Sequence, residues 1–334
     1  GIPADVEPLY ERYWAWTLGV SPGGSIHRLS LCPSILEMCE VHAAATGRPL
    51  DQVLNGTVYL VPPLKLAYQE AAQVVWFLER GLRVNIGGSM ITGGATGPVT
   101  LAGMVTLTIA ERLLIALLNR ALFGDRTWAL GMSVTAMDFR TTMRPYGRPD
   151  MALANLVGAQ MARRYGVNYG GHGGLTDAMR PSPQAAAQKI QSALPTLMVS
   201  GQAGIAAGLL AVDEVFSPVQ MVLDDQIISA MSQFTRDYEV SDAAIAADLV
   251  AKVGPGGTFL AEPHTAEWFR REMWEPVIWE RHPFTAWQER DGRTDVERAR
   301  EYALALLADV EEDHGLSRGE DRELQQIIRR ALQQ

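Results

Sequence analysis

The chain has 334 residues, of which 47% are hydrophobic and 20% are charged, and its formal net charge at pH 7 is −9. This length and apolar content are typical of one α/β barrel or of two ordinary domains with a sizeable core. An acidic chain lacks the basic face that neutralises phosphates, which excludes a general nucleic-acid binder.

The apolar and sulfur-containing residues narrow the class of protein further. No signal peptide is visible and no uncharged apolar run reaches about 20 residues, so we expect a cytoplasmic protein without a membrane span. Cys32 and Cys39 lie two turns apart in an expected helix, a rise of roughly 10 Å, which argues against a disulfide or zinc site between them. We therefore expect no metal site in this chain.

Residues 1–56 are expected to form an aromatic and helical segment that leads into a barrel. Tyr10, Trp14 and Trp16 form an aromatic cluster. The hydrophobic pattern predicts a helix over 35–46, and Gly47 supplies the residue that commonly ends one.

Residues 57–240 repeat a unit of strand, loop and helix. The expected units are a strand over 57–61 with a helix over 64–80, a strand over 83–86 with a helix over 98–122, a strand over 128–133 with a helix over 150–165, a strand over 167–170 with a helix over 184–193, and a strand over 196–200 with an apolar helical stretch and then a helix over 218–238. Short, nearly continuous apolar strands that alternate with helices indicate a parallel sheet covered on both faces.

A (β/α)8 TIM-type barrel with extra N- and C-terminal helices suits this pattern better than an open sheet, because glycine and polar residues follow successive strands. In such a barrel the carboxyl ends of the strands form the active site. The loops expected around this mouth are 89–97, 134–148, 171–183 and 201–204.

Residues 241–334 are expected to form a C-terminal helical extension. Ser241 is placed to cap a short helix over 241–252, and another helix begins at His264. From Thr294 onward, two helical stretches rich in Arg and Glu are typical of solvated faces or a packing surface.

A glycine-rich stretch at 83–103 organises the chain and reads RVNIGGSMITGGATGPVTLAG. Its segment Gly93-Gly94-Ala95-Thr96-Gly97 lacks the spacing of a dinucleotide fingerprint or a Walker loop, which disfavours nucleotide binding. Glycines at the carboxyl end of a strand let a ligand approach the main chain, so Gly93, Gly94 and Thr96 are candidate cofactor-binding residues. The alternative is a tight turn that only packs. Pro98 suits the first turn of the following helix.

Four segments occur in the order GGATGPVTLAG at 93–103, FRTTMRPYGRPD at 139–150, GGHGGLTDA at 170–178 and VGPGGTFLAEPHT at 253–265. Together they resemble the trimethylamine methyltransferase family over roughly residues 57–281. The resemblance implies a (β/α)8 barrel that demethylates methylamines and passes the methyl group to the cobalt of a separate corrinoid protein. Family members are usually longer at the amino end, and this chain starts without a methionine.

One departure from the family concerns the substrate. Founding members contain pyrrolysine, whose electrophilic ring adds to an amine, whereas this chain has no such residue. A quaternary ammonium has no lone pair with which to form that adduct. The resemblance therefore implies a betaine-type quaternary amine as methyl donor and cobalamin, carried by the partner protein, as the cofactor.

The candidate substrate-binding residues are mostly aromatic. Aromatic faces hold quaternary ammonium groups by cation–π attraction, worth about 0.5–2 kcal/mol each. By position these are Phe139, Tyr146, Tyr169 and Phe216, each of which is alternatively a core or lid aromatic.

The polar candidates follow expected strands. His172 stands between glycines and is the main catalytic candidate, by bonding a substrate carboxylate or facing the cobalt; the alternative is a bond to neighbouring backbone. Asp177 is a second catalytic candidate that counters the cation or caps the helix after Pro183. Arg140 is placed to receive a carboxylate and Gln202 to orient substrate.

Arg144 and the pair Asp224-Asp225 are further polar candidates. Arg144 could bind a carboxylate as Arg140 could, although either arginine could instead pair with Asp138 or Asp150. The pair Asp224-Asp225 lacks a third ligand at suitable spacing, so it is expected to be solvated or salt-bridged.

Two other functions remain open at this stage. One is a related barrel that moves a methyl group between a corrinoid protein and a pterin. The other is a non-catalytic barrel that binds a small cation or acts as a scaffold, which the aromatic clusters at 10–16 and 268–287 permit because aromatic residues are enriched at interfaces. A corrinoid partner, a small quaternary amine and a homo-oligomer are expected; a nucleic acid or membrane partner is not.

Overall fold

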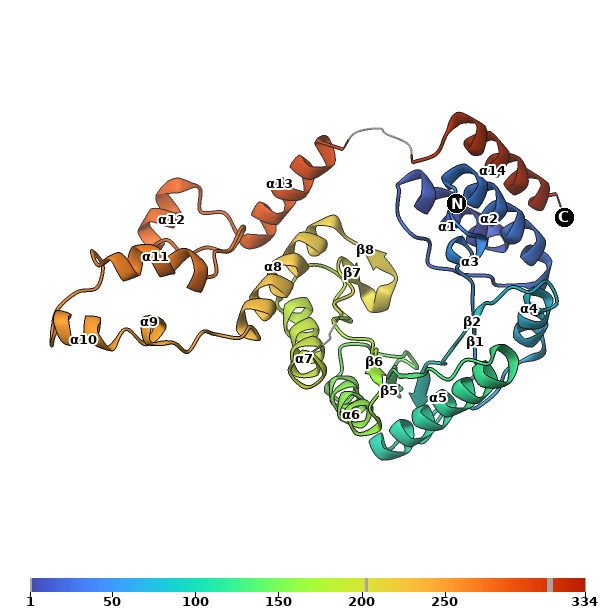
Figure 1. Cartoon of the computed structure of the whole chain (residues 1–334), viewed down its shortest axis with the longest axis horizontal. Helices are drawn as coiled ribbons and strands as arrows, with labels where there is room; N and C mark the ends of the chain where they lie inside the picture. Colours follow the sequence, from blue (N-terminus) through green and yellow to red (C-terminus); the bar gives the residue numbers. More distant parts are fainter. Residues whose placement is uncertain (1, 202–203, 311–314, 334) are drawn as a thin grey trace. The chain divides into compact units, whose positions relative to one another are not determined.

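The computed structural model describes residues 2–201, 204–310 and 315–333 as a mixed α/β chain (Figure 1). The chain divides into two compact units. The first comprises residues 1–145, 153–171 and 310–334, and the second comprises residues 146–152 and 172–309. Helix α6 (Pro149–Tyr165) contributes its first residues to the second unit and the rest to the first.

The first unit begins with a helical layer. Its elements are η1 (Ala4–Val6), α1 (Glu7–Thr17), η2 (Leu29–Leu31), α2 (Cys32–Thr46) and α3 (Leu50–Val53), and the C-terminal α14 (Arg318–Ala331). The helix predicted over 35–46 is confirmed as α2, which starts earlier and ends at Gly47 in the left-handed conformation. Helix α14 packs on α2, where Leu324, Ile327 and Ile328 enter the same apolar core as Ile35 and Met38.

Six short strands of the first unit form parallel pairs. They are β1 (Thr57–Tyr59), β2 (Asn85–Gly87), β3 (Ile91–Gly93), β4 (Ala129–Leu130), β5 (Val134–Ala136) and β6 (Asn168–Tyr169). Strand β1 pairs with β2, β3 with β5, and β4 with β6, all in parallel. Ser25 also forms an isolated parallel bridge to Thr57. If β2 and β3 are counted as one interrupted strand, and β4 and β5 as another, each pair joins one strand to the next along the chain.

The expected strand over 83–86 corresponds to β2, which is followed closely by a second short strand, β3. The expected strand over 128–133 corresponds to β4, which is likewise followed by β5. The β-branched residues Ile91 and Thr92 lie in β3, so the glycine-rich loop is shorter than the predicted 89–97. Val134–Ala136 likewise belongs to β5 rather than to a loop. Pro98 lies before helix α5, which begins at Leu101 with Thr100 as its N-cap, so its placement in the first helical turn is wrong.

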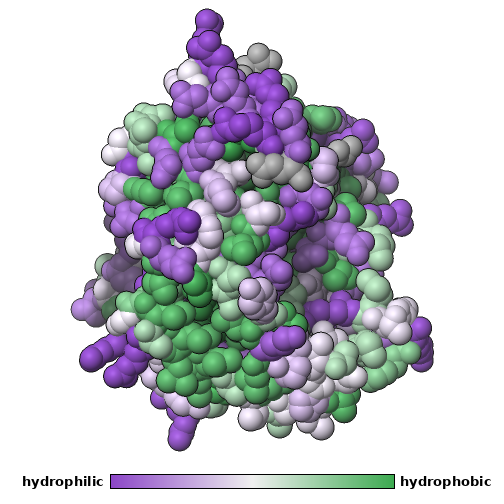
Figure 2. Space-filling view, turned by 90° about the vertical axis from the view of Figure 1, so that its right-hand side faces the viewer, coloured by the Kyte–Doolittle hydropathy of each residue, from purple (hydrophilic) through white to green (hydrophobic). Residues whose placement is uncertain are grey.

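Helices α4 (Tyr68–Leu78), α5 (Leu101–Phe123) and α6 follow the strands of the first unit. By length and composition alone, α5 is the one helix among the described residues that could cross a membrane. It buries Met104 and Ile115 and carries Glu111 and Arg112 at its centre. Figure 2 shows hydrophobic side chains gathered in the lower part of its view. On α5, Leu113 and Leu117 are exposed apolar residues.

The second unit contains α7 (Pro183–Ser200), the antiparallel strands β7 (Leu209–Leu210) and β8 (Val215–Phe216), η3 (Ala211–Asp213) and α8 (Pro218–Phe234). The strand predicted over 196–200 is wrong, because these residues form the last turns of α7 although Pro195 lies inside that helix. The threonine and serine hydroxyls there donate to carbonyls one turn earlier, as in Thr196 to Ser192 at 3.1 Å. The stretch before Pro218, expected to be helical, contains the β7–β8 hairpin instead.

The rest of the second unit is helical. Its elements are α9 (Asp242–Ile245), α10 (Ala247–Val253), α11 (Pro263–Glu272), α12 (Phe284–Arg290) and α13 (Asp295–Ala308). Ser241 caps α9 as predicted, although the helix expected over 241–252 is interrupted at Ala246, where φ is 53°. Thr294 and Glu297 form a reciprocal capping box at the start of α13, which packs along α8.

We expect the carboxyl group of Asp125, just after α5, to titrate unusually low. It accepts hydrogen bonds from the Thr127 backbone N–H at 2.8 Å, the Thr127 hydroxyl at 2.7 Å and the Arg83 guanidinium at 2.6 Å. The Thr127 backbone bond is the largest cause, and together these bonds hold the pKa of Asp125 well below its usual range.

Because the folded pKa of Asp125 is depressed, its contribution to stability is complete above the unfolded pKa, about 3.9, and is lost as the pH falls toward the folded value. Carboxyl NMR titration of the Thr127→Val variant should show a pKa raised relative to wild type but still depressed, since the backbone bond and Arg83 remain. An unchanged pKa in this variant would show that the hydroxyl has no effect.

Candidate functional site

Two loops of the first unit meet at one strand edge. Strands β3 and β5 pair in register, with Gly93 opposite Ala136, so the segments that follow them start side by side. These segments are the turn at 94–97 and the loop at 137–144. Both carry residues singled out from the sequence.

The turn after β3 is held by its own hydrogen bonds. The Gly94 N–H donates to the Gly97 carbonyl at 2.9 Å, and the Thr96 hydroxyl accepts from the Thr92 N–H at 2.9 Å. Gly94 adopts a φ of 88°, which favours glycine. Thr96 therefore shapes the turn, and the exposed Gly94 presents bare main chain at its surface.

Phe139 lies directly against this turn. A Cβ placed on Gly94 would lie 2.6 Å from the Phe139 Cζ, so the ring contacts the glycine backbone. The Phe139 side chain is nevertheless 66% exposed. The structure thus brings Gly94 and Phe139 together, and the ring remains available to a cationic ligand.

Substitution of Gly94 by Ala is expected to destabilise the protein by about 1–3 kcal/mol, because the new methyl group meets the Phe139 ring at a positive φ. Gly124→Ala is the matched control: its φ is 67°, but no atom lies within 4 Å of its added Cβ. Urea unfolding of both variants would separate the ring contact from backbone strain. Equal losses of unfolding free energy in the two variants would contradict the contact between Gly94 and the Phe139 ring.

The loop after β5 is built on Asp138 and Arg144. Asp138 Oδ1 accepts from the Arg140 N–H at 2.8 Å and the Thr141 N–H at 3.3 Å, and the Arg140 side chain lies on the exposed surface. Arg144 donates to the Ser133 carbonyl at 2.8 Å and to the Ile91 carbonyl at 3.2 Å. Arg144 therefore ties β3 to β5, which leaves Arg140 as the surface arginine of this loop.

Tyr169, at the end of β6, is buried rather than exposed to solvent. Its hydroxyl donates to Asn155 Oδ1 on α6 at 2.6 Å, and its ring contacts the position of Gly158 on the same helix. Burial raises the pKa of Tyr169. The structure places this ring between its strand and α6, where the side chain is 7% exposed.

In the second unit, Asp177 fastens a neighbouring loop. Its carboxylate accepts from the Tyr146 N–H at 2.6 Å and the Gly147 N–H at 3.0 Å. The expectation that it caps the next helix is wrong, because Ser182 caps α7 by accepting from the Ala185 N–H. Asp177 and Tyr146 are thus brought together.

The remaining candidates of the second unit differ in exposure. His172 lies in an exposed loop, whereas Tyr146 is buried with Met151 and Leu175. Phe216 in β8 is 59% exposed and its ring packs over Gly208. Gln202 lies outside the described residues.

The sequence interpretation missed a buried carboxylate on α5. Glu111 is 1% exposed and accepts hydrogen bonds from the Ser89 hydroxyl and, at 3.0 Å, from the Leu64 N–H. It therefore joins the segments that follow β1 and β2. The available signal was the adjacent pair Glu111-Arg112 at the centre of an otherwise apolar helix.

Buried ionisable groups of other kinds serve the core. Cys32 and Cys39 are free thiols, and burial raises their pKa values to about 12 and about 11. Asp224 pairs with Lys189, in line with the salt-bridged interpretation, while Asp225 is exposed. Among the described residues, no group of three or more His, Cys, Asp or Glu side chains is arranged to hold a metal ion.

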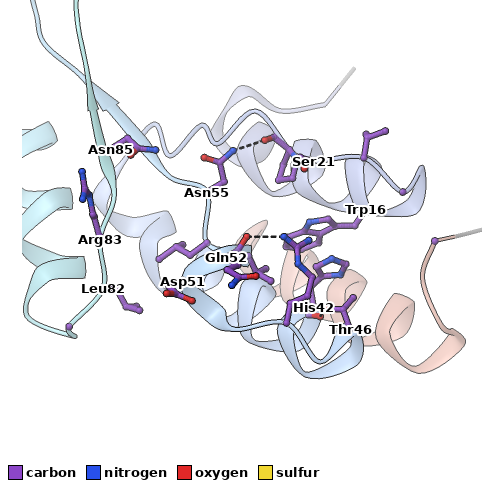
Figure 3. A pocket seen from close by; sticks show the side chains of 18 residues that line it. Trp16, Ser21, His42, Thr46, Asp51, Gln52, Asn55, Leu82, Arg83 and Asn85 are labelled. Carbon is purple, nitrogen blue, oxygen red and sulfur yellow. Dashed lines mark hydrogen bonds between the residues drawn. The ribbon is translucent and has the colours of Figure 1, made fainter. Parts of the chain in front are cut away.

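A cavity of about 840 Å³ in the first unit lies near the amino ends of β1 and β2 (Figure 3). Trp16 stacks on His42 at one side of it, and Asn55 and Asn85 border it at the strand starts. Because parallel α/β folds place catalytic groups at the carboxyl ends of strands, this cavity is not where we expect chemistry.

Comparison with known proteins identifies the family. The model of the trimethylamine methyltransferase (MTTB) family matches residues 24–334, and the chain belongs to this family. The chain is 30% identical over 240 residues to a glycine betaine methyltransferase of Desulfitobacterium hafniense strain Y51, which covers 70% of this chain and 49% of that protein.

Other relatives carry the family's own name. Over 226 residues the chain is 30% identical to a trimethylamine methyltransferase MttB of Methanosarcina barkeri, which covers 67% of this chain and 45% of that protein. A trimethylamine methyltransferase MttB of D. hafniense strain DSM 10664 / DCB-2 is 25% identical over 245 residues. The chain therefore spans about half the length of the curated relatives it matches.

Proposed function

We propose that this protein is a methyltransferase that transfers a methyl group from a betaine-type quaternary amine to the cobalt of a corrinoid protein. Membership of the trimethylamine methyltransferase family is the observation that carries the proposal. The choice of substrate is supported by the relative named glycine betaine methyltransferase and by the lack of pyrrolysine in this sequence.

We further propose that the working protein is a (β/α)8 barrel, with residues 57–240 as its core and 241–334 as a helical extension. Support comes from the order of pairing, because each parallel pair joins consecutive segments of the chain from Ser25 through β6. Sequential parallel neighbours are what a β/α barrel requires. A cytoplasmic location and a homo-oligomer belong to the same proposal.

In this mechanism the chain mainly binds and orients. The corrinoid of the partner protein would supply the methyl acceptor, and the leaving group would be a neutral tertiary amine, so this chain would need no general acid. The exposed Phe139 ring would hold the cationic nitrogen, and the Gly93–Gly94 main chain and Thr96 would form the surface approached by the corrin. Arg140 would attract the substrate carboxylate from the same loop.

The second unit contributes its own candidates. His172, on an exposed loop, would bond a carboxylate or face the corrin. Asp177 would act by holding the Tyr146–Gly147 backbone, since its carboxylate is engaged there. Phe216 and Gln202 remain proposed substrate contacts, whereas Tyr169, buried against α6, would support the site from behind.

The direct test mixes the protein with cobalamin reduced to cobalt(I) and follows the visible spectrum for methyl-cobalt(III). Methylation by glycine betaine but not by trimethylamine would support the proposal. Methylation by trimethylamine alone would contradict the substrate. If neither free cobalamin nor the cognate corrinoid protein is methylated with any amine, the proposed activity is contradicted. Calorimetry with the same amines would then distinguish a cation-binding barrel, which binds one of them, from a scaffold, which binds none.

Phe139→Ala gives a residue-level arm of this test. Loss of one cation–π contact should weaken betaine binding roughly 2- to 30-fold. Phe284→Ala is the matched control, because Phe284 in α12 is 67% exposed, almost the same as Phe139 at 66%. Equal effects of the two substitutions would remove Phe139 from the site.

A further inference from the structure

Among the described residues, the guanidinium of Arg112 forms no salt bridge, although the neighbouring Glu111 carboxylate attracts it. Arg112 is half-buried at the centre of α5, and its one hydrogen bond among the described residues runs from Nε to the Gly131 carbonyl at 3.2 Å. Its sequence neighbour Glu111 is engaged by Ser89 and Leu64. Burial lowers the pKa of Arg112, which reports the cost of holding this charge away from water.

The two terminal nitrogens of Arg112 are not sealed inside the protein. They make no hydrogen bond within the described chain, yet they are absent from the set of fully enclosed polar atoms without partners. Arg112 lines a cavity of about 330 Å³ in the first unit. A partly desolvated guanidinium with free donors beside a cavity is suited to a bound anion.

The other charges of the cavity cancel. Arg83 and Asp125 both line it and pair with each other at 2.6 Å. The net charge left by the lining side chains is therefore that of the Arg112 guanidinium, a single positive charge. A monoanion matches this charge, whereas a phosphate dianion would leave an excess negative charge.

Asn119 offers a second polar group. It lies two turns after Arg112 on α5, lines the same cavity, and has an enclosed Oδ1 with no hydrogen-bond partner. The amide nitrogen of Asn119 makes no hydrogen bond within the described chain and is not among the enclosed polar atoms, so it can donate to an acceptor in the cavity. The amide nitrogen of Asn119 and the terminal nitrogens of Arg112 are thus donors for one ligand that accepts hydrogen bonds.

Apolar walls indicate an organic ligand. Ile86 from β2, Ile115 from α5 and the Trp128 side chain line the cavity together with the polar groups. Such walls suit a short carbon chain better than an inorganic ion. We propose that this cavity is a binding site for a small organic monocarboxylate, held by Arg112 and Asn119.

The site is distinct from the proposed methyl-transfer site. Its lining includes Arg83, Ala129 and Asn168, which lie at or just before the amino ends of β2, β4 and β6. The proposed substrate contacts follow the carboxyl ends. The inference therefore stands whether or not methyl transfer is demonstrated.

The test measures propanoate binding to the full chain by saturation-transfer NMR and by the shift of the unfolding midpoint, with sodium chloride at equal ionic strength as the reference. Saturable binding is expected for wild type. Arg112→Met should weaken it at least tenfold. Asn119→Asp should do the same, because it places a carboxylate two turns from the guanidinium and does not rely on losing Arg112.

Arg120→Met is the matched control, since Arg120 is exposed on the same helix and does not line the cavity. It should bind propanoate as wild type does. No saturable binding to wild type, or equal loss in the Arg120 variant, would overturn the site. Tighter binding of inorganic phosphate than of propanoate would overturn its assignment to a monocarboxylate.

Discussion

Substitution of Lys189 by Met should destabilise the protein by about 3–5 kcal/mol, the cost of leaving one member of a buried ion pair unpaired. Both side chains of the Lys189–Asp224 pair are 0% exposed, and the ammonium lies 2.5 Å from the carboxylate. Lys189 also donates to the Ala206 carbonyl at 3.0 Å, so the variant loses two bonds. Urea denaturation monitored by circular dichroism would measure the loss.

The partners of Asp224 explain why the loss is large. Its carboxylate also accepts from the Gly208 N–H and from the Gln220 amide, both at 2.8 Å. These two neutral donors cannot compensate a buried negative charge once the ammonium is gone. We therefore expect the variant to bear nearly the full cost of a buried charge without an ionic partner.

Two controls sharpen this prediction. Lys252→Met removes an exposed lysine paired with Glu262, where the lysine side chain is 66% exposed, and should cost no more than about 1 kcal/mol. The double variant Lys189→Met/Asp224→Leu removes both buried charges and should be more stable than Lys189→Met alone. If Lys189→Met costs no more stability than Lys252→Met, the interpretation of Lys189–Asp224 as a buried ion pair is contradicted.

Much of the helical structure could be predicted from the sequence because its signals are local. Gly47 ends α2 and Ser241 begins α9 where capping chemistry places them. The strands are harder to predict from the sequence, since runs of two or three paired residues depend on partners far along the chain. Thr196–Ser200 is rich enough in β-branched and small residues to indicate a strand, yet packing keeps it helical past Pro195.

The candidate site was predictable to the level of loops but not of side chains. Sequence position placed Phe139 and Gly94 after neighbouring strands, and the structure puts them in contact. It could not show that Tyr169 turns toward α6, because alternate residues of a strand face opposite sides and the register comes from pairing. Nor could it reveal the unpaired Arg112, since charge compensation depends on tertiary contacts.

Substitution of Arg12 by Met should cost about 3 kcal/mol of stability in the first unit, because charge-assisted hydrogen bonds to buried carbonyls are lost. Arg12 is 0% exposed and donates to the carbonyls of Ser25 at 2.7 Å, Asn55 at 2.7 Å and Pro8 at 2.9 Å. Without the guanidinium, the Ser25 and Asn55 carbonyls lose the donor that links them. Equilibrium unfolding in urea would give the free-energy change.

The position of these carbonyls makes Arg12 a link between α1 and the first strands. Ser25 bridges in parallel to Thr57, and Asn55 lies two residues before β1 and borders the cavity of Figure 3. Hydrogen exchange should therefore become faster at the Thr57 N–H, which donates to the Gly24 carbonyl. Arg28→Met, which removes an exposed arginine paired with Asp5, is the control and should change stability by less than about 1 kcal/mol.

The variant Arg12→Lys should be only partly as stable as wild type, because an ammonium cannot reproduce the planar fork that reaches carbonyls on separate segments. Full stability with lysine would show that charge alone, and not the geometry of the guanidinium, holds this junction.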